Sequence, residues 1–373
     1  MLYWIAIRFA EDNILFNIFR YQTFRAAGAV VTAFVVAFWF GPDIISRLRM
    51  LKVGQVVRTE GPQTHLGKSG TPTMGGVIIV LATVIPTLLW ARLDNPNTVT
   101  AVVVLGWLGF LGFMDDYLKI ARKKTEGLRG RYKIIGQAGI GLLVGLALVF
   151  VPWFDIGIPT RPEAWTQIPF FKSVHLEFWW PLYVLFVAFI IVGCSNAVNL
   201  TDGLDGLAAG LSSIAAVTFG VFAYLLGRVD AANYLNLFYI PGAGELTIFC
   251  VALAGGCMGF LWFNAHPAEV FMGDTGSLAI GGVLGAIAVL LRAEFLLAIV
   301  GFVFVAEALS VMLQTVYYKW TKRKYGSGRR IFRMAPLHHH FEQIGWHESK
   351  VIIRFWIMGI MCALVAFATL KIR

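Results

Sequence analysis

Apolar stretches long enough to cross a membrane recur along this chain, separated by shorter polar segments. A helix needs roughly 20 apolar residues to cross the hydrocarbon of a bilayer. The pattern predicts an all-α polytopic membrane protein with about ten transmembrane helices in one integral membrane domain, 1–373. The segment 1–20 lacks the basic start and cleavage site of a signal peptide, so the first span is expected to be retained. The predicted spans are 22–41, 72–91, 98–114, 134–152, 179–194, 204–226, 244–264, 275–291, 295–318 and 351–370.

Composition supports this class and excludes a soluble domain. Hydrophobic residues make up 58% of the 373 residues, charged residues only 14%, and the mean hydropathy is +0.72. A soluble domain of this length does not stay in solution with such a composition. The formal net charge of +10 favours anionic substrates at a membrane surface. Nucleic acid is not an expected partner, because the chain has no soluble basic domain.

Lysine and arginine predict the orientation of the spans, because short cytoplasmic loops hold an excess of them. Most of the 31 lie in 47–68, 119–133 and 319–354, after the first, third and ninth spans. These loops are therefore expected in the cytoplasm, and with ten spans both termini are expected in the periplasm. Taken singly, each basic residue is also explained by topology and contact with anionic lipid.

Residues suited to catalysis gather at the predicted cytoplasmic ends of the spans. They comprise two adjacent carboxylates, a stretch rich in amides, acids and glycines, a segment with an asparagine and an aspartate, and three consecutive histidines. These segments are 112–117, 193–206, 262–277 and 333–340. Four loops that are far apart in the sequence are thus expected to meet on one face of the membrane.

Each of these segments also has an ordinary structural explanation. Asp115 and Asp116 can cap a helix at the interface, although carboxylates at membrane depth are costly and tend to be functional. Asp274 can cap the next helix, bind a metal, or do both. The segment 196–206 is too rich in acceptors and glycines for a mere turn, and glycine lets a ligand approach the backbone. The histidines 338–340 diverge on a helix, so at most two can reach one target, and zinc is only weakly indicated.

Two further features of the sequence resemble functional motifs. The segment 61–69 resembles a phosphate-binding P-loop, but five residues rather than four separate its glycines and no buried strand precedes it. A P-loop is rejected, and Lys68 is kept as a candidate phosphate contact. Glu307 and Gln314 lie seven residues apart in the ninth span and share a helical face. They predict either a buried hydrogen-bonded pair or the wall of a pocket.

Together these residues indicate phosphoryl chemistry beside a bilayer. Carboxylate and amide oxygens suit Mg²⁺, which typically bridges one or two carboxylates to substrate phosphates. Phosphoryl transfer needs such a cation, positive side chains that hold the phosphates, and alignment of nucleophile and leaving group. The residues alone therefore predict Mg²⁺-dependent transfer of a phosphate-linked group to or from a lipid phosphate.

At these residues the sequence resembles a known family, the phospho-N-acetylmuramoyl-pentapeptide transferases of bacterial peptidoglycan synthesis. They belong to the superfamily of polyprenyl-phosphate N-acetylhexosamine-1-phosphate transferases. The matching motifs follow one another over most of the chain, with no departure at the motif positions. They are 70–76 (GTPTMGG), 115–116 (DD), 196–206 (NAVNLTDGLDG), 271–274 (FMGD) and 334–340 (MAPLHHH).

The resemblance implies a reaction and a setting. Undecaprenyl phosphate attacks the β-phosphate of UDP-N-acetylmuramoyl-pentapeptide, which releases UMP and leaves lipid I, with Mg²⁺ as cofactor. Direct attack and a covalent enzyme intermediate both remain open. The resemblance also implies a multi-pass protein of the bacterial inner membrane with its active face in the cytoplasm, a homodimer, and inhibition by uridine-containing antibiotics.

The resemblance implies residue roles as well. Asp274 is the expected magnesium ligand with Asp115 and Asp116 beside it, and Asp115 is expected to deprotonate or orient the lipid phosphate. Lys68 and Asn264 are expected near the diphosphate. The remaining expectations are Asn199, Asp202 and Asp205 in the nucleotide site with Asn196 among the substrate contacts, Phe271 stacked on uracil, His338 (also catalytic), His339 and His340 at the sugar-phosphate end, and Gln314 in the pocket wall.

Two other functions stay open at this point. A sister transferase that uses UDP-N-acetylglucosamine has the same chemistry, although the form of the histidine segment favours the muramoyl enzyme. An ion-coupled transporter would place facing polar residues deep in several spans, whereas here only Glu307 and Gln314 lie well inside one.

Overall fold

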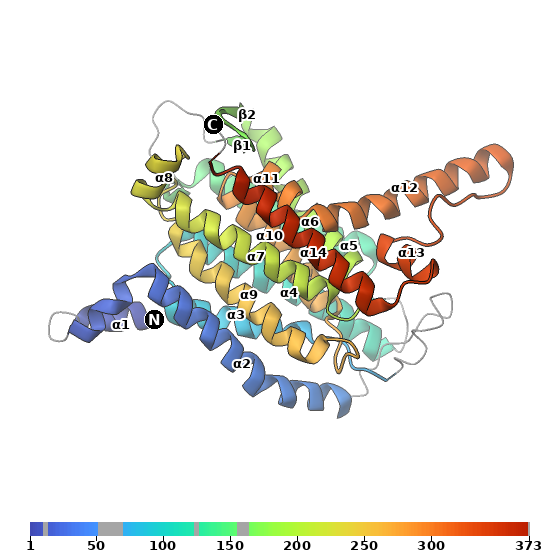
Figure 1. Cartoon of the computed structure of the whole chain (residues 1–373), viewed down its shortest axis with the longest axis horizontal. Helices are drawn as coiled ribbons and strands as arrows, with labels where there is room; N and C mark the ends of the chain where they lie inside the picture. Colours follow the sequence, from blue (N-terminus) through green and yellow to red (C-terminus); the bar gives the residue numbers. More distant parts are fainter. Residues whose placement is uncertain (10–13, 51–69, 123–126, 155–163, 372–373) are drawn as a thin grey trace.

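Helices make up most of the structure (Figure 1). The computed structural model describes residues 1–9, 14–50, 70–122, 127–154 and 164–371. Its elements in chain order are α1 Leu2–Phe9, η1 Ile14–Arg20, α2 Gln22–Met50, α3 Gly76–Trp90, α4 Pro96–Arg122, α5 Gly130–Phe150, η3 Pro152–Phe154, β1 Trp165–Ile168, β2 Phe171–Glu177, α6 Trp180–Thr201, α7 Leu207–Leu226, α8 Val229–Leu235, α9 Gly244–Asn264, α10 Gly273–Leu290, α11 Glu294–Val300, α12 Phe302–Tyr325, α13 Leu337–Gln343 and α14 Glu348–Ala368.

Within the described ranges, eight helices are long and apolar enough to cross a membrane: α2, α4, α5, α6, α7, α9, α10 and α14. The predicted second span contains only a 15-residue helix, α3, because the residues before it pair with the backbone ahead of α10. The predicted ninth span is not one straight helix. Its two parts, α11 and α12, meet at Gly301 with a bend of 85°, and glycine favours such an interruption because its helix propensity is low.

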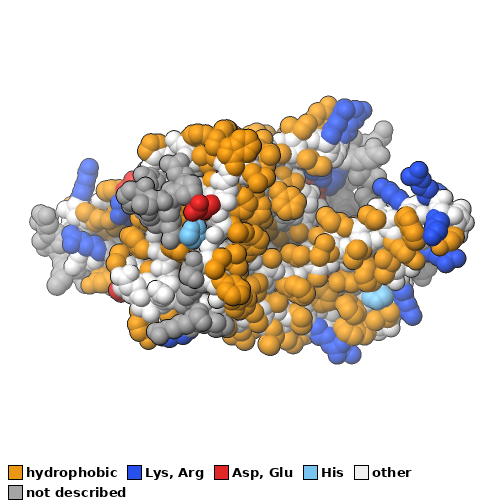
Figure 2. Space-filling model, turned by 90° about the horizontal axis from the view of Figure 1, so that it is seen from above, with side chains coloured by type: hydrophobic (Ala, Val, Ile, Leu, Met, Phe, Trp, Pro, Cys, Tyr) orange, Lys and Arg blue, Asp and Glu red, His pale blue; other side chains and the backbone are white. Residues whose placement is uncertain are grey.

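The outer surface is strongly apolar. Exposed large hydrophobic side chains lie along α2, α5, α12 and α14. Figure 2 shows them covering most of the face seen from above, with lysine and arginine gathered mainly toward its two ends. This distribution suits a protein surrounded by lipid, with basic residues at the membrane surfaces.

The central helix of the bundle is α10. It packs against α3, α4, α6 and α7, and 89% of its apolar window is buried. Glycines make these contacts close: a Cβ atom on Gly76 would lie 2.1 Å from the backbone nitrogen of Gly276, and one on Gly281 would lie 2.5 Å from the Cys194 carbonyl oxygen. Backbone thus packs on backbone, as in other membrane helices rich in small residues.

A β-hairpin is the exception to the predicted all-α fold. β1 and β2 pair antiparallel with Trp165 opposite Glu177, and Phe170 in the turn has a φ of 70°. Along β2, apolar Val174 and Leu176 alternate with polar residues, which is the period of a strand. The span prediction considered only long apolar stretches and therefore missed it.

The helix bundle has two opposite ends, which are defined by the contacts between helix termini. The site end gathers the ends of α4, α6 and α9 and the starts of α5, α10 and α14. The far end gathers the starts of α2, α6 and α9, the ends of α3 and α7, the α10–α11 turn and the hairpin. In Figure 1 both chain termini lie toward the far end, beside α1 and beside the hairpin.

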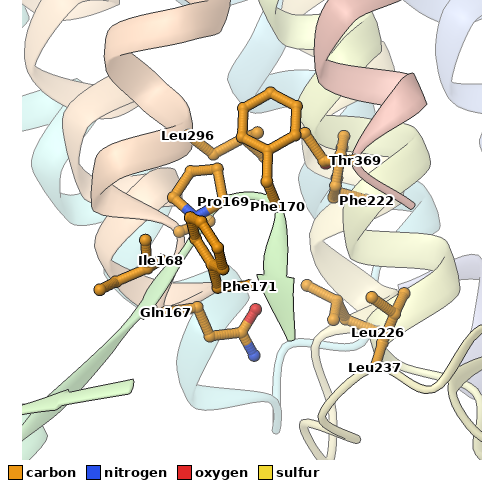
Figure 3. Close-up of a pocket in the computed structure, with 11 residues that line it drawn as sticks. Gln167, Ile168, Pro169, Phe170, Phe171, Phe222, Leu226, Leu237, Leu296 and Thr369 are labelled. Carbon is orange, nitrogen blue, oxygen red and sulfur yellow. The ribbon is translucent and has the colours of Figure 1, made fainter. Parts of the chain in front are cut away.

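Buried charges and a small cavity characterise the far end. Arg25 of α2 donates two hydrogen bonds of 2.7 Å to Glu245 of α9, and both side chains are buried. Glu294 of α11 is also buried and accepts from Tyr183 of α6 at 2.9 Å. A mainly apolar cavity of about 50 Å³ lies under the hairpin turn. Figure 3 shows the side chains that line it, with Phe170 near Phe222 of α7 and Thr369 at the end of α14. None of the predicted site residues lines this cavity.

Candidate active site

Three carboxylates meet where α4 ends and α10 begins. Asp115 and Asp116 lie in the last two turns of α4, and Asp274 is the second residue of α10. One oxygen atom from each lies within 4.8 Å of the others. Asp115 and Asp116 are buried, and Asp274 is partly exposed. The structure therefore brings the predicted Asp pair and the predicted metal ligand into one acidic cluster (Asp115, Asp116 and Asp274).

Glycine allows α4 and α10 to meet this closely. A Cβ atom on Gly112 would lie 2.1 Å from the carbonyl oxygen of Asp274. Gly273 has a φ of 71°, a conformation that glycine adopts without steric cost. A Cβ atom there would lie 2.6 Å from Asp116 Oδ2. These two glycines set the separation of the carboxylates.

Two lysines lie among the carboxylates. Lys119, one turn after Asp115 in α4, places its Nζ 2.6 Å from Asp115 Oδ2 and 3.1 Å from Asp274 Oδ2. Lys133 of α5 places its Nζ 2.7 Å from Asp274 Oδ2 and 3.2 Å from Asp115 Oδ2. The prediction had assigned both lysines to membrane topology. The available signal for Lys119 was its spacing of four residues from Asp115, which puts the two on one helical face.

Hydrogen bonds hold each carboxylate of the cluster in place. Asp116 Oδ2 accepts from the backbone nitrogen (3.0 Å) and hydroxyl (2.8 Å) of Thr275, and Asp115 Oδ1 accepts from a backbone nitrogen of the α4–α5 connection at 2.7 Å. Asn199 of α6 donates to Asp274 Oδ1 at 2.8 Å. The predicted nucleotide contact Asn199 thus lies directly beside the predicted metal ligand.

The donor set of the acidic cluster fits a magnesium ion. It offers carboxylate oxygens from two helices, the ligand type that Mg²⁺ prefers. Three ionised carboxylates and the two lysine ammonium groups that touch them leave one net negative charge. A cation together with substrate phosphates would therefore be accommodated electrostatically.

The loop after α6 carries the next predicted residue, Asp202. Burial, followed by repulsion from Asp274 and Asp116, raises the pKa of the Asp202 carboxyl to about 8. Asp202 therefore lies close enough to the acidic cluster to feel its charge. The loop ends at Gly206, whose φ of 82° is a conformation that favours glycine. Helix α7 begins at the next residue.

Asp205 belongs to a second group of side chains at the site end. Its Oδ2 lies 3.1 Å from Nδ1 of His266 and accepts from the Ala268 nitrogen at 3.2 Å. Glu348, the first residue of α14, accepts from the Asp205 nitrogen at 3.1 Å, and its other oxygen lies 3.5 Å from His266 Nδ1. His266 and Glu348 were not predicted as site residues. His266 stood within a segment already singled out, whereas Glu348 gave no signal beyond its charge.

Asn264 borders the loop after α6, and Phe271 lies in the segment that leads to α10. Asn264 is buried, accepts from the Gly206 nitrogen at 2.9 Å and donates to the Val270 carbonyl at 2.9 Å. The Phe271 backbone pairs with the segment before α3, donating to Pro72 at 2.8 Å, and its side chain is partly exposed. Asn264 thus joins two loops, and the motif 70–76 lies against the segment that leads to Asp274.

The three histidines bind different groups, but the rings of His338 and His339 lie 4.2 Å apart between centroids, so these two do not diverge as predicted. His338 is fully buried, and its backbone nitrogen donates to Glu307 of α12 at 3.1 Å. The ring of His339 lies 2.7 Å from a carboxylate oxygen of Glu342. His340 Nδ1 accepts from the Arg333 nitrogen at 3.2 Å. His338 packs against the loop after α6, where a Cβ atom on Gly203 would lie 2.2 Å from its Nε2.

Gln314 and Asn196 contact protein groups. Gln314 accepts from the backbone nitrogens of Ile331 and Phe332, each at 3.0 Å, and so holds the chain ahead of the histidines. Asn196 donates to Gln137 of α5 at 2.9 Å. Lys68 lies outside the described residues. Glu307 and Gln314 share a face, as predicted, but do not bind each other: Glu307 accepts from His338, and Gln314 binds the residues just ahead of the histidine segment.

Comparison with known proteins identifies the family. The profile of glycosyl transferase family 4 matches residues 98–292, and phospho-N-acetylmuramoyl-pentapeptide-transferase signature 1 matches residues 68–80. The proteins named phospho-N-acetylmuramoyl-pentapeptide-transferase from Gemmatimonas aurantiaca and Desulfotalea psychrophila are 55% and 52% identical, over 100% and 96% of both chains. The one from Endomicrobium trichonymphae is 48% identical over 100% of both chains. The chain therefore belongs to the phospho-N-acetylmuramoyl-pentapeptide-transferase family.

Proposed function

We propose that this protein transfers phospho-N-acetylmuramoyl-pentapeptide from UDP-N-acetylmuramoyl-pentapeptide to undecaprenyl phosphate. An oxygen of the lipid phosphate forms a bond to the β-phosphorus, the bond from that phosphorus to the bridging oxygen breaks, and UMP leaves. The product is lipid I, an intermediate of peptidoglycan synthesis. The observation that carries the proposal is the acidic cluster with its two lysines at one end of a membrane helix bundle, in a chain of this family.

Residues of the cluster supply the chemistry. The ammonium groups of Lys119 and Lys133 attract the phosphates and balance charge that develops on them. Asp115 orients the lipid phosphate, which is already largely ionised near neutral pH, so that a strong base is not required. Mg²⁺ is the proposed cofactor, held by Asp274 with Asp115 and Asp116, and when bound it neutralises charge on the phosphates.

The nucleotide is proposed to lie along the loop after α6. Asn199 and Asp202 adjoin the acidic cluster and face the diphosphate. Asp205 and the ring of Phe271 are the proposed contacts of the uracil. The remaining proposed contacts are Asn196, Asn264, Gln314, His338, His339 and His340, together with Lys68. The positions of Asn196, Asn264 and Gln314, whose amides already bind protein groups, favour an indirect role in shaping the site.

The proposed setting follows from charge. The described residues of the basic segments 119–133 and 319–354 lie at or next to the site end, which favours a cytoplasmic location for that end in the bacterial inner membrane. Both termini then face the periplasm, and the whole chain acts as one domain. A homodimer and inhibition by uridine-containing antibiotics complete the proposal.

The decisive experiment measures UMP release by the purified protein with undecaprenyl phosphate and Mg²⁺. UDP-N-acetylmuramoyl-pentapeptide and UDP-N-acetylglucosamine are offered separately, with and without a chelator. We expect release only with the muramoyl nucleotide, and none after chelation. Release only with the glucosamine nucleotide would assign the sister reaction. Release with neither nucleotide would reject the transferase and favour a transporter.

A further inference from the structure

A buried carboxylate contacts a buried imidazole below the histidine segment. Glu307 in α12 and His338 in α13 both have side chains that are 0% exposed. Glu307 Oε1 accepts from the His338 backbone nitrogen at 3.1 Å and lies 3.3 Å from the ring Nδ1. One carboxylate oxygen thus contacts both the backbone and the ring of His338.

The other ring nitrogen faces the loop after α6. A Cβ atom on Gly203 would lie 2.2 Å from His338 Nε2. In the part of the chain that the structure describes, neither ring nitrogen has a hydrogen-bond partner, so the 3.3 Å approach of Glu307 to Nδ1 is an electrostatic contact. Gly203 lies between Asp202 and Asp205, in the loop proposed to bind the nucleotide. A buried, unpartnered imidazole nitrogen therefore adjoins the proposed substrate site.

Helix α12 holds the histidine segment and the residue just ahead of it. Gln314 binds the backbone at Phe332, and Glu307, two helical turns earlier, binds His338. The 85° bend at Gly301 sets α12 at a steep angle to α11, and in Figure 1 α12 projects from the bundle above α13. The two side chains thus fix the segment from one face of a single helix.

Packing alone does not account for Glu307. A carboxylate within a membrane-spanning helix is costly, and Glu307 Oε2 has no hydrogen-bond partner among the described residues. An apolar side chain of similar volume would avoid that cost. A carboxylate beside an imidazole commonly fixes both the tautomer and the orientation of the ring.

We propose that Glu307 is a positioning residue that keeps the proton of His338 on Nδ1 and directs Nε2 toward the loop at Gly203. Nε2 is then an unprotonated acceptor packed against Gly203, in the loop that is proposed to bind the substrate. This inference rests on the proposed transferase function and adds a residue that acts on the substrate only through His338.

The test compares E307A and E307Q with wild type in the full-length protein, by UMP release at varied nucleotide concentration. E307A should lower kcat at least about tenfold while KM stays within about threefold. E307Q keeps an acceptor oxygen but loses the charge, so it should retain more activity than E307A. Because E307A can fail to fold, E307Q carries the kinetic test by itself. E294Q removes another buried carboxylate, at the far end, and should keep the wild-type kcat.

Nitrogen NMR on protein with ¹⁵N-labelled histidine reports the tautomer directly, and the signals lost in H338Q identify His338. Wild type should show the proton on Nδ1, and E307A should lose that preference. An unchanged kcat and tautomer in both variants, or an equal loss of kcat in E294Q, would overturn the inference. If wild type releases no UMP, the proposed function fails, whereas the NMR comparison still tests the contact between Glu307 and His338.

Discussion

At the scale of single residues, the carboxylates of the site end lie in unlike surroundings. Asp115 and Asp274 face two lysines, whereas Asp202 is repelled by other carboxylates and has a pKa raised by burial and that repulsion from 3.8 to about 8. The folded protein therefore holds a proton on Asp202 at pH values where the unfolded chain has lost it. By linkage, this group lowers the free energy of unfolding as pH rises from about 4 to about 8.

Replacing Asp202 by asparagine should remove this pH dependence. Without added divalent cation, the stability of D202N relative to wild type should increase steadily as pH rises from about 5 to about 8 and stay constant above that, because the unfolded wild-type carboxyl is already ionised across this range while the folded one is not. Thermal unfolding of the purified protein across this range provides the measurement. D205N is the matched control, since the Asp205 carboxylate accepts hydrogen bonds and its loss should give no gain at high pH. A constant difference between D202N and wild type would contradict the prediction.

Sequence reasoning found the acidic cluster but not its cations. Asp115, Asp116 and Asp274 were predicted to meet because each stands at the same end of a span. Lys119 and Lys133 stand in segments full of basic residues, where topology explains any one of them. Asp205 lies in the loop after α6 but contacts His266 instead of the acidic cluster. Packing between segments that are distant in the sequence decides this orientation, so the sequence pattern does not reveal it.

At the scale of elements, glycine contacts position the catalytic groups. G112A should lower UMP release at least about tenfold, because the added Cβ would lie 2.1 Å from the Asp274 carbonyl oxygen and α10 must move. G106A, in the same helix, is the matched control, since a Cβ there meets no atom within 4 Å. The kcat of both variants and their unfolding midpoints give the comparison. Equal activity of G112A and G106A would show that the cluster tolerates displacement.

The helices were predicted well and their breaks were not. Apolar windows identify spans because hydrocarbon thickness sets their length. A bend such as that between α11 and α12 leaves the composition of the window unchanged, so the averaged hydropathy of 295–318 cannot reveal it. The hairpin was not predicted because its apolar and polar residues alternate and never form a long apolar run.

At the scale of the whole molecule, the two ends have separate tasks. The site end holds the proposed chemistry, whereas the far end holds buried contacts between helices, among them Arg25 and Glu245. This division predicts that far-end substitutions change stability without changing kcat.

The pair of Arg25 and Glu245 tests this division. E245Q leaves a buried arginine without its counter-ion, which should cost on the order of 3 kcal/mol of stability. Its unfolding midpoint should fall, while kcat measured below that midpoint should stay within about twofold of wild type. D94N removes an exposed ion pair with Arg92 and should change the midpoint little. A large drop in kcat for E245Q at a temperature where it is folded would show that the two ends are coupled.

The burial of α10 has a consequence for how the chain enters the bilayer. Among the eight spanning helices of the described chain, α10 has the lowest mean hydropathy, 1.5, against 1.7 to 2.3 for the others, yet it is the most buried. Transfer of α10 from water into lipid is therefore the least favourable of the eight. Its glycine-lined surface is stabilised only when neighbouring helices pack against it. During biogenesis, contacts with α4 and α6, which are synthesised earlier, should retain α10 in the membrane. The start of α10, which carries Asp274, should therefore reach its final position only after those helices are in place.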